Sequence, residues 1–145
     1  EVYGGLYTWF ESMQYSDVPG VQGICPAGWH LPSDPEWCEL SQFIDPTVDC
    51  SIWGWCGIDG GTKMKSITGW VSQNGTNASG FNGLPDGGSH FDGGFFDLGS
   101  RALYWTSTDF YIYGAWLWQL KDDTSTVIRD CKHRGYGFNV RCVKD

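Results

Sequence analysis

The chain has 145 residues, the length of one domain with a single hydrophobic core, and its nine Trp and 21 Gly favour short elements joined by many turns. The formal net charge is −8 and the lysines and arginines do not cluster, so we expect no nucleic acid among the partners. No apolar run approaches the roughly 20 residues that cross a bilayer, so we expect no membrane-spanning segment.

The N-terminal part of the chain predicts a strand, a loop and the start of the main helix. Residues 3–10, YGGLYTWF, predict a short aromatic strand, and residues 11–23 predict a loop. In the sequence SDPEW, Ser33 and Glu36 have the spacing of a capping box, in which each side chain bonds the backbone N–H of the other residue. Pro35 suits the first helical turn, because an amide at that position has no helical partner.

One face of this helix is apolar. The residues that share it recur at i, i+3 and i+7: Trp37, Leu40 and Ile44. Pro46 prevents continuation, so we expect the helix to cover about 34–44. A second, shorter helical turn is predicted within 61–70. The stretch that follows, to about residue 100, is rich in Gly, Asn and Asp and predicts loops.

Strand patterns return in the last third of the chain. Four segments carry them: 102–108, 114–121, 124–131 and 137–145. Turn-forming residues at 121–126 join two of these segments into an antiparallel hairpin. Helices early and strands late predict an α+β fold with an antiparallel sheet, in one domain over residues 1–145.

Six blocks of sequence, in chain order, resemble one family. They are GGLYTW (4–9), QGICPAGWHLPSDPEW (22–37), TKMKSITGW (62–70), SGFNGLPDGG (79–88), YWTST (104–108) and GFNVRCVKD (137–145). Together they resemble the Fibrobacter succinogenes major paralogous domain, found in many exported bacterial proteins. The resemblance implies a C-type-lectin-like fold, with one main and one short helix packed on a twisted antiparallel sheet in a loop-rich chain. It also implies that the first and last strands pair, so that the termini lie close together.

The resemblance divides the chain into a scaffold, about 1–108 and 137–145, and an interval of about 109–136. Family members often have an Asn-rich interval here, similar to the template-derived variable regions of diversity-generating retroelements, in which adenines of AAC codons are randomised. The Asn positions of that pattern, together with Trp118, are the candidate ligand-binding residues: Tyr111, Tyr113, Gly114, Leu117, Trp118, Gln119, Lys121, Asp123, Thr124, Thr126, Ile128, Asp130, Lys132, His133 and Tyr136. Cys131 also falls on an Asn position, and we expect it to be unpaired.

Strand alternation separates these candidates into two groups. One face of the segment 114–121 is expected to be core: Trp116, Trp118 and Leu120. The other face is expected to point outward, together with positions of the next strand: Leu117, Gln119, Lys121, Thr126, Ile128 and Asp130. The flanking loops are expected to carry Tyr111, Tyr113, His133 and Tyr136. Trp118 stays open, because its strand phase points inward whereas the family pattern often has a polar residue there.

A surface of Tyr and Trp mixed with small polar residues has the chemistry of a paratope, because rigid aromatic rings give contact area at a small entropic cost. We therefore expect a ligand-binding protein with a diversified surface, which recognises a protein or another macromolecule on a cell or phage surface. The alternative is a carbohydrate-binding bacterial surface adhesin, in which exposed rings stack on sugars. In both cases the expected location is extracellular or on the bacterial cell surface, including display on phage.

No arrangement of residues predicts an enzyme. His30 lies in the framework before the main helix, where we expect a hydrogen-bonded structural histidine. Cys131 and His133 lie two positions apart on a strand and lack the third group of a catalytic triad. The block WHLPSDPEW also resembles one in formylglycine-generating enzymes, but those need a reactive cysteine pair where this chain has Cys131 and a Cys142 that we expect to be structural.

The sequence predicts no cofactor. Neither Cys-x-x-Cys nor Cys-x-x-His spacing occurs, which argues against a zinc site. Calcium-dependent sugar sites contain EPN or QPD, and LPD at 84–86 is a thin substitute for either. A structural calcium stays open, because hard oxygen ligands on Gly-rich loops suit it: Asp86, Asp92, Asp97 and Asp109.

Six cysteines indicate an oxidising compartment, and spacing alone leaves fifteen connectivities open. Within the resemblance, Cys25 and Cys142 belong to framework blocks and are the first expected disulfide. Two alternatives remain for a further bridge: Cys50 with Cys56, or Cys38 with either of them.

Overall fold

The computed structural model describes residues 3–145, which form a mixed α and β architecture with short helices and antiparallel sheets. The helices are α1 (Trp9–Ser12), α2 (Asp34–Ile44) and α3 (Gly60–Met64). The strands are β1 (Trp29–His30), β2 (Gly54–Cys56), β3 (Gly88–Ser89), β4 (Phe95–Phe96), β5 (Arg101–Phe110), β6 (Gly114–Lys121), β7 (Val127–His133) and β8 (Val143–Lys144). The single-domain prediction over 1–145 includes residues 1 and 2, which lie outside the described residues. No helix of the described part is long and apolar enough to cross a membrane.

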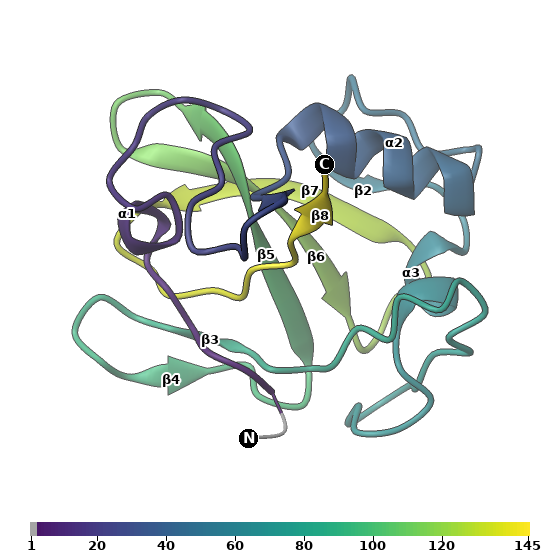
Figure 1. The fold of residues 1–145 in the computed structure, drawn as a ribbon. Helices are drawn as coiled ribbons and strands as arrows, with labels where there is room; N and C mark the ends of the chain where they lie inside the picture. The colour runs from purple at the N-terminus through teal and green to yellow at the C-terminus, as the bar shows by residue number, and fades with distance from the viewer. Residues whose placement is uncertain (1–2) are drawn as a thin grey trace.

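The central sheet has four antiparallel strands in the order β2-β7-β6-β5 (Figure 1). β6 pairs with β5 on one side and with β7 on the other, and the predicted hairpin turn at 121–126 is confirmed. β6 has the predicted bounds, whereas β7 begins at Val127, three residues later than predicted. The last predicted strand, 137–145, is reduced to β8 and a few isolated bridges.

The main helix forms where the capping signal predicts it. The backbone N–H of Glu36 donates to Ser33 Oγ at 3.4 Å, and the backbone N–H of Ser33 donates to Glu36 Oε2 at 2.8 Å. The helix ends at Ile44, two residues before Pro46. α2 lies across the sheet and buries Trp37 against it (Figure 1). The predicted short second helix is also confirmed, as α3.

The predicted strand at 3–10 is wrong. Thr8 and Glu11 form a second capping box, which starts α1 at Trp9, so the aromatic segment becomes helical instead of extended. Only Tyr7 keeps a strand-like bridge, to Phe138. The expected pairing of the first and last strands is confirmed, since β1 pairs with β8 in an antiparallel sheet. The expected proximity of the termini is wrong, because the purple chain before α1 runs away from β8, beside which the C-terminus lies (Figure 1).

Hydrophobic clusters cover the central sheet on both faces. The first cluster lies between the sheet and α2, and includes Trp37, Tyr104, Trp118, Leu120 and Val127. The second lies between the sheet and the N-terminal segment, residues 3–31, and includes Trp9, Met13, Leu31, Trp105, Leu117 and Phe138. Successive side chains of β6 therefore enter different clusters, and neither face of the middle of this strand is open to water.

Two disulfides are present, one between distant parts of the chain and one that closes a short loop. The expected bridge between Cys25 and Cys142 is present and closes the N-terminal segment onto the chain before β8. Cys38 pairs with Cys50, which is one of the alternatives left open for the second bridge. Cys56 is buried and free. Cys131 is half-buried and free, as expected. Two disulfides fit an oxidising compartment.

Candidate ligand-binding surface

The candidate ligand-binding residues lie at the two ends of β6 and along its middle. The eight residues of β6 separate its ends by about 25 Å. At the end that joins β5, the exposed or half-buried candidates are Tyr111, Tyr113, Gly114, Lys132 and His133. At the end that joins β7, they are Lys121, Asp123, Thr124 and Thr126. The structure therefore does not unite the predicted residues in one surface.

Four of the candidates are buried. They are Leu117, Trp118, Gln119 and Ile128, with 0%, 2%, 2% and 5% of their surface exposed. Leu117 packs in the second cluster with Trp105 and Phe138. The expected exposure to water of Leu117, Gln119 and Ile128 is therefore wrong. The N-terminal segment covers the face of β6 that carries Leu117, whereas Trp118 packs in the first cluster, between the sheet and α2.

Gln119 and Trp118 use their polar atoms inside the protein. Gln119 accepts a hydrogen bond from Arg101 at 3.0 Å and donates to Asp130 Oδ2 at 2.8 Å. The Trp118 indole N–H donates to Asp34 Oδ1 at 2.9 Å, at the first turn of α2. The strand phase of Trp118 was thus the better guide to its position than the family pattern.

The most exposed aromatic surface of this region lies at the end where β5 meets β6. We call it the aromatic end, and it consists of Trp53, Phe110, Tyr111, Ile112, Tyr113 and Trp116. Trp53, Tyr111, Ile112 and Tyr113 expose 56%, 81%, 79% and 71% of their surface. The Phe110 ring lies 5.1 Å from that of Trp53, 4.7 Å from that of Trp116 and 4.6 Å from that of Tyr111. The rings of Trp53, Phe110, Tyr111 and Trp116 are therefore in contact with one another, and the Tyr113 ring stacks on that of His133.

Arg134 fixes the loop that carries Tyr111, Ile112 and Tyr113. Its side chain donates to the carbonyl oxygens of Gly114 at 3.0 Å and Tyr111 at 3.2 Å. Its backbone N–H donates to the carbonyl oxygen of Tyr113 at 3.0 Å. The guanidinium group lies 4.3 Å from the centre of the Trp9 ring. Tyr111 has a φ of 53°, in the left-handed region where Asn is favoured over most residues. An Asn at this position of the family pattern would fit that backbone conformation.

A second arginine supports the aromatic end from the core side. The Arg129 guanidinium lies 3.7 Å from the centre of the Trp116 ring and pairs with Asp34 through Nε, at 3.0 and 3.1 Å. Trp116 was expected to lie in the core. It is instead half-buried, between the Arg129 guanidinium and the rings of Trp53 and Phe110. Contacts with Arg129 and Arg134 hold the surface in place, which limits the entropy that it loses on binding.

Sequence reasoning missed Trp53 and its neighbour Trp55. Trp53 donates through its indole N–H to Asp130 Oδ1 at 2.9 Å, and Trp55 exposes 63% of its surface on β2. The available signal was SIWGW, in which large apolar residues crowd a Gly-containing turn directly after a cysteine.

Burial acts to raise the pKa of Asp130, but hydrogen bonds from Lys132 and Trp53 outweigh it and lower that pKa, so the carboxylate stays charged.

The residues considered for catalysis have structural environments. Burial raises the pKa of the Cys131 thiol, which disfavours the reactive thiolate. His133 Nδ1 accepts a hydrogen bond from the backbone N–H of Gly135 at 3.1 Å. His30 bonds Asp145 at 2.7 Å and Glu36 at 2.8 Å through its two ring nitrogens, as expected of a structural histidine.

The carboxylates considered for calcium serve other contacts. Asp97 pairs with Arg101 at 3.0 Å, and Asp109 lies 3.5 Å from Arg134. Among residues 3–145, no group of three or more His, Cys, Asp and Glu side chains has a geometry that suits a metal ion. The structure therefore does not assemble the four aspartates into one site.

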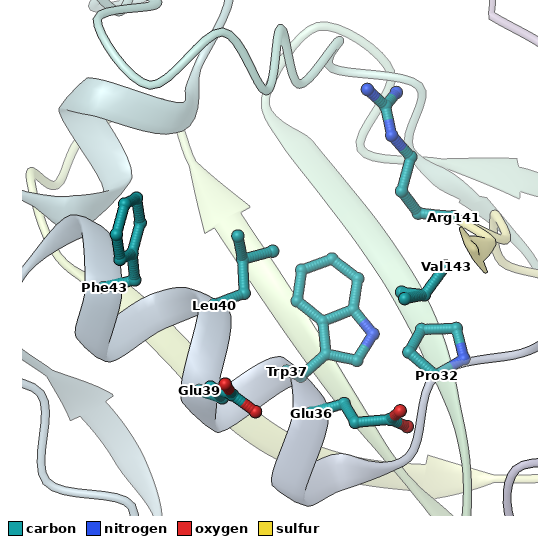
Figure 2. A pocket seen from close by; sticks show the side chains of 8 residues that line it. All are labelled: Pro32, Glu36, Trp37, Glu39, Leu40, Phe43, Arg141 and Val143. Atoms are coloured by element: carbon teal, nitrogen blue, oxygen red, sulfur yellow. The ribbon is translucent and has the colours of Figure 1, made fainter. Parts of the chain in front are cut away.

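An apolar groove runs along α2, away from the aromatic end. Its volume is about 410 Å³, and Figure 2 shows the Trp37 ring between Leu40 and Pro32 with Phe43 at one end and Arg141 across from the helix. Phe43 exposes 87% of its surface, and the buried indole N–H of Trp37 has no hydrogen-bond partner among the described residues. The sequence predicted the helix face but not this groove.

Residues 1–144 match the family model of the Fibrobacter succinogenes major domain (Fib_succ_major). The chain belongs to this family. The match covers nearly all of the chain, so the family blocks at 4–37 and 104–145 belong to one Fibrobacter succinogenes major domain. No curated protein and no solved structure matches the chain.

Proposed function

We propose that this Fibrobacter succinogenes major domain is a non-catalytic binding module that recognises a macromolecule on a cell or phage surface through its aromatic end. The observation that carries the proposal is the surface of exposed rings held by Arg129 and Arg134. Exposed aromatic residues on a rigid base are typical of binding hot spots. An exposed surface of this kind suits a large partner better than an enclosed small molecule.

We infer that the fold is C-type-lectin-like. The inference is supported by a capped main helix packed on an antiparallel sheet, a loop-rich stretch between α3 and β5, and a disulfide that joins the N-terminal segment to the end of the chain. In such a fold, the hairpin loop of the aromatic end lies on the surface and tolerates exchange of its side chains.

The diversification proposal applies to a smaller set of positions than the sequence pattern indicates. We propose that variation of the retroelement type concentrates on exposed positions such as Tyr111, Tyr113 and His133. The buried positions of the same interval are expected to vary only among residues that fit the core. An extracellular or cell-surface location, including display on phage, completes the proposal and agrees with the two disulfides.

Binding of the labelled protein to a panel of intact bacterial cells tests the proposed function. The double variant Ile112→Ser/Tyr113→Ser removes two exposed anchors, and we expect it to bind positive cells at least about tenfold more weakly. The matched control is Phe43→Ser, which removes an equally exposed ring from the α2 groove. Equal loss in the control and the double variant would contradict the proposal.

Treatment of the cells with protease or with periodate distinguishes a protein ligand from a carbohydrate ligand. If the aromatic end recognises a protein, protease treatment of the cells abolishes binding and periodate oxidation leaves it intact. The opposite result would identify a glycan ligand and favour the adhesin, in which the exposed rings of Trp53 and Tyr113 stack on sugars.

A further inference from the structure

A polar pocket of about 300 Å³ lies between three segments on a different part of the molecule. The N-terminal segment contributes Tyr3 and Tyr7, the loop before β3 contributes Asp86, and the chain before β8 contributes Asn139. Tyr104 of β5 lines the same pocket. In Figure 1 the yellow chain before β8 crosses β5, and the bridge between Tyr7 and Phe138 joins this part of the chain to the N-terminal segment.

Two buried polar atoms of this pocket have no hydrogen-bond partner among the described residues. They are Asp86 Oδ1 and Asn139 Nδ2. A buried polar atom without a partner costs about 1–3 kcal/mol, so two in one pocket are unusual. One is an oxygen of a carboxyl group and the other an amide donor, so a ligand that both donates and accepts hydrogen bonds can satisfy the pair.

The backbone holds both side chains in place. The backbone N–H of Asn139 donates to Leu103 at 3.0 Å, and its carbonyl oxygen accepts from Trp105 at 3.0 Å. On the other side, the N–H of Gly87, next to Asp86, donates to Arg101 at 2.8 Å. The two groups therefore stand on segments that are anchored to β5, which is the arrangement expected of a preorganised site.

Two of the polar groups that line the pocket, Asp86 and Tyr104, are neutral at neutral pH. Burial raises the pKa of Asp86 to about 8, so its carboxyl group is largely protonated. Burial also raises the pKa of Tyr104, which stays a phenol. Arg141, which lines the rim, is held by the carbonyl oxygen of Phe81 at 2.8 Å and lies 4.7 Å from that ring. A neutral ligand rich in hydroxyl groups fits these surroundings better than an ion.

We propose that this pocket binds one saccharide residue, with its hydroxyl groups bonded to Asp86, Asn139 and Tyr104 and its ring against Tyr3 or Tyr7. Both rings are partly exposed, by 38% and 37%, and stand at the rim. The volume lies at the lower end of the range for small-molecule sites, which suits a single sugar ring. Tyr104 and Phe110 are six residues apart on β5, about 20 Å, so this site is separate from the aromatic end and does not rest on the function proposed for it.

Titration of the isotope-labelled protein with a panel of monosaccharides, followed by a glycan array, tests this proposal. We expect at least one sugar to shift the side-chain amide signal of Asn139 in the nitrogen–proton spectrum. Asp86→Ala removes both the hydroxyl donor and the acceptor oxygen of the protonated carboxyl group and is expected to weaken that sugar at least about tenfold. Phe43→Ser is the control and is expected to leave sugar binding unchanged, since Phe43 lies outside the pocket.

Three results would overturn the proposal. The first is a panel and an array in which no sugar binds at millimolar concentration. The second is a sugar that binds Asp86→Ala as well as it binds the natural protein but does not bind Tyr113→Ser, which would place the sugar at the aromatic end. The third is an Asn139 signal that responds to amines and to no sugar. None of these results depends on whether intact cells bind the aromatic end.

Discussion

Asp45 and Asp86 show how local hydrogen bonds decide the charge of a buried carboxyl group. Asp45 is 3% exposed, and its Oδ2 accepts from three backbone N–H groups between Ile58 and Gly60, at 2.6 to 3.1 Å. Burial acts to raise its pKa, but these bonds and that of Thr47 hold the pKa well below its usual range. At Asp86, burial outweighs the backbone hydrogen bonds of Asp86 and Leu103, which act to lower the pKa, and raises it to about 8.

The stability of the protein should therefore depend on the protonation of Asp86. The pKa of Asp86 rises from 3.8 to about 8 on folding, so the folded state binds the proton more tightly than the unfolded state between these values. The contribution of this group to stability is complete below about pH 4 and is lost as the pH rises toward 8. We expect Asp86→Asn to remove this loss.

Urea unfolding at pH 5 and pH 8 measures the effect. Relative to the natural protein, Asp86→Asn should have a higher free energy of unfolding at pH 8 than it has at pH 5. A difference that stays the same at both pH values would show that the carboxyl group does not titrate in this range. Tyr104, Arg141 and Asn139 are unchanged in the comparison, so their contributions cancel.

At the scale of elements, Asp45 joins the C-terminal end of α2 to the start of α3. It is the C-cap residue of α2, and the N–H groups that it accepts from lead into α3. Removal of the carboxylate leaves three N–H groups without this acceptor, one of them buried and two part-buried, and a buried N–H group without a partner costs about 1–3 kcal/mol. The two helices are therefore expected to lose their relative position when this contact is lost.

We expect Asp45→Ala to lower the free energy of unfolding by about 3 kcal/mol at pH 7. Because the pKa of Asp45 is depressed on folding, its contribution is present above about pH 4 and is lost as the pH falls through the folded-state pKa. The difference between the variant and the natural protein should thus narrow below pH 3. Asp49→Ala, on an exposed carboxylate of the following loop, is the matched control and should change stability little. Equal stability of the natural protein and Asp45→Ala would refute this role.

The disulfides connect elements in a way that chemical mapping can check. Peptide mapping without reduction should show Cys25 joined to Cys142 and Cys38 joined to Cys50. Alkylation of the folded protein should modify Cys131, which is half-buried, and should modify the buried Cys56 only after unfolding. A bridge that contains Cys56 or Cys131 would contradict the structure.

Local signals in the sequence predicted single elements well. Ser33, Glu36 and Pro46 predicted both ends of α2, because capping and helix termination depend on residues within a few positions. The same signal at Thr8 and Glu11 was overlooked, since the aromatic residues around it favour strands. The arrangement of rings at the aromatic end was not predictable, because Trp53 and Phe110 are in contact although they lie 57 residues apart in the sequence.

At the scale of the whole molecule, the sheet is covered on both faces, and strand alternation cannot reveal this. Leu117 and Trp118 are adjacent in β6, point to opposite faces and are both buried. The pattern predicted their opposite directions, but only the path of the N-terminal segment decides that the second face is dry. Exchange of side chains is therefore confined to the edges and ends of the sheet, where the aromatic end lies.

Two matched libraries displayed on cells test this division between exchangeable and fixed positions. One randomises Ile112, Tyr113 and His133, which are exposed, and the other randomises Leu117, Gln119 and Ile128, which are buried. The measured quantity is the fraction of each library that remains folded and resistant to protease. Core substitutions cost about 2–5 kcal/mol out of a total stability of about 5–15 kcal/mol. We predict that most of the first library and few members of the second stay folded; equal fractions would contradict the account.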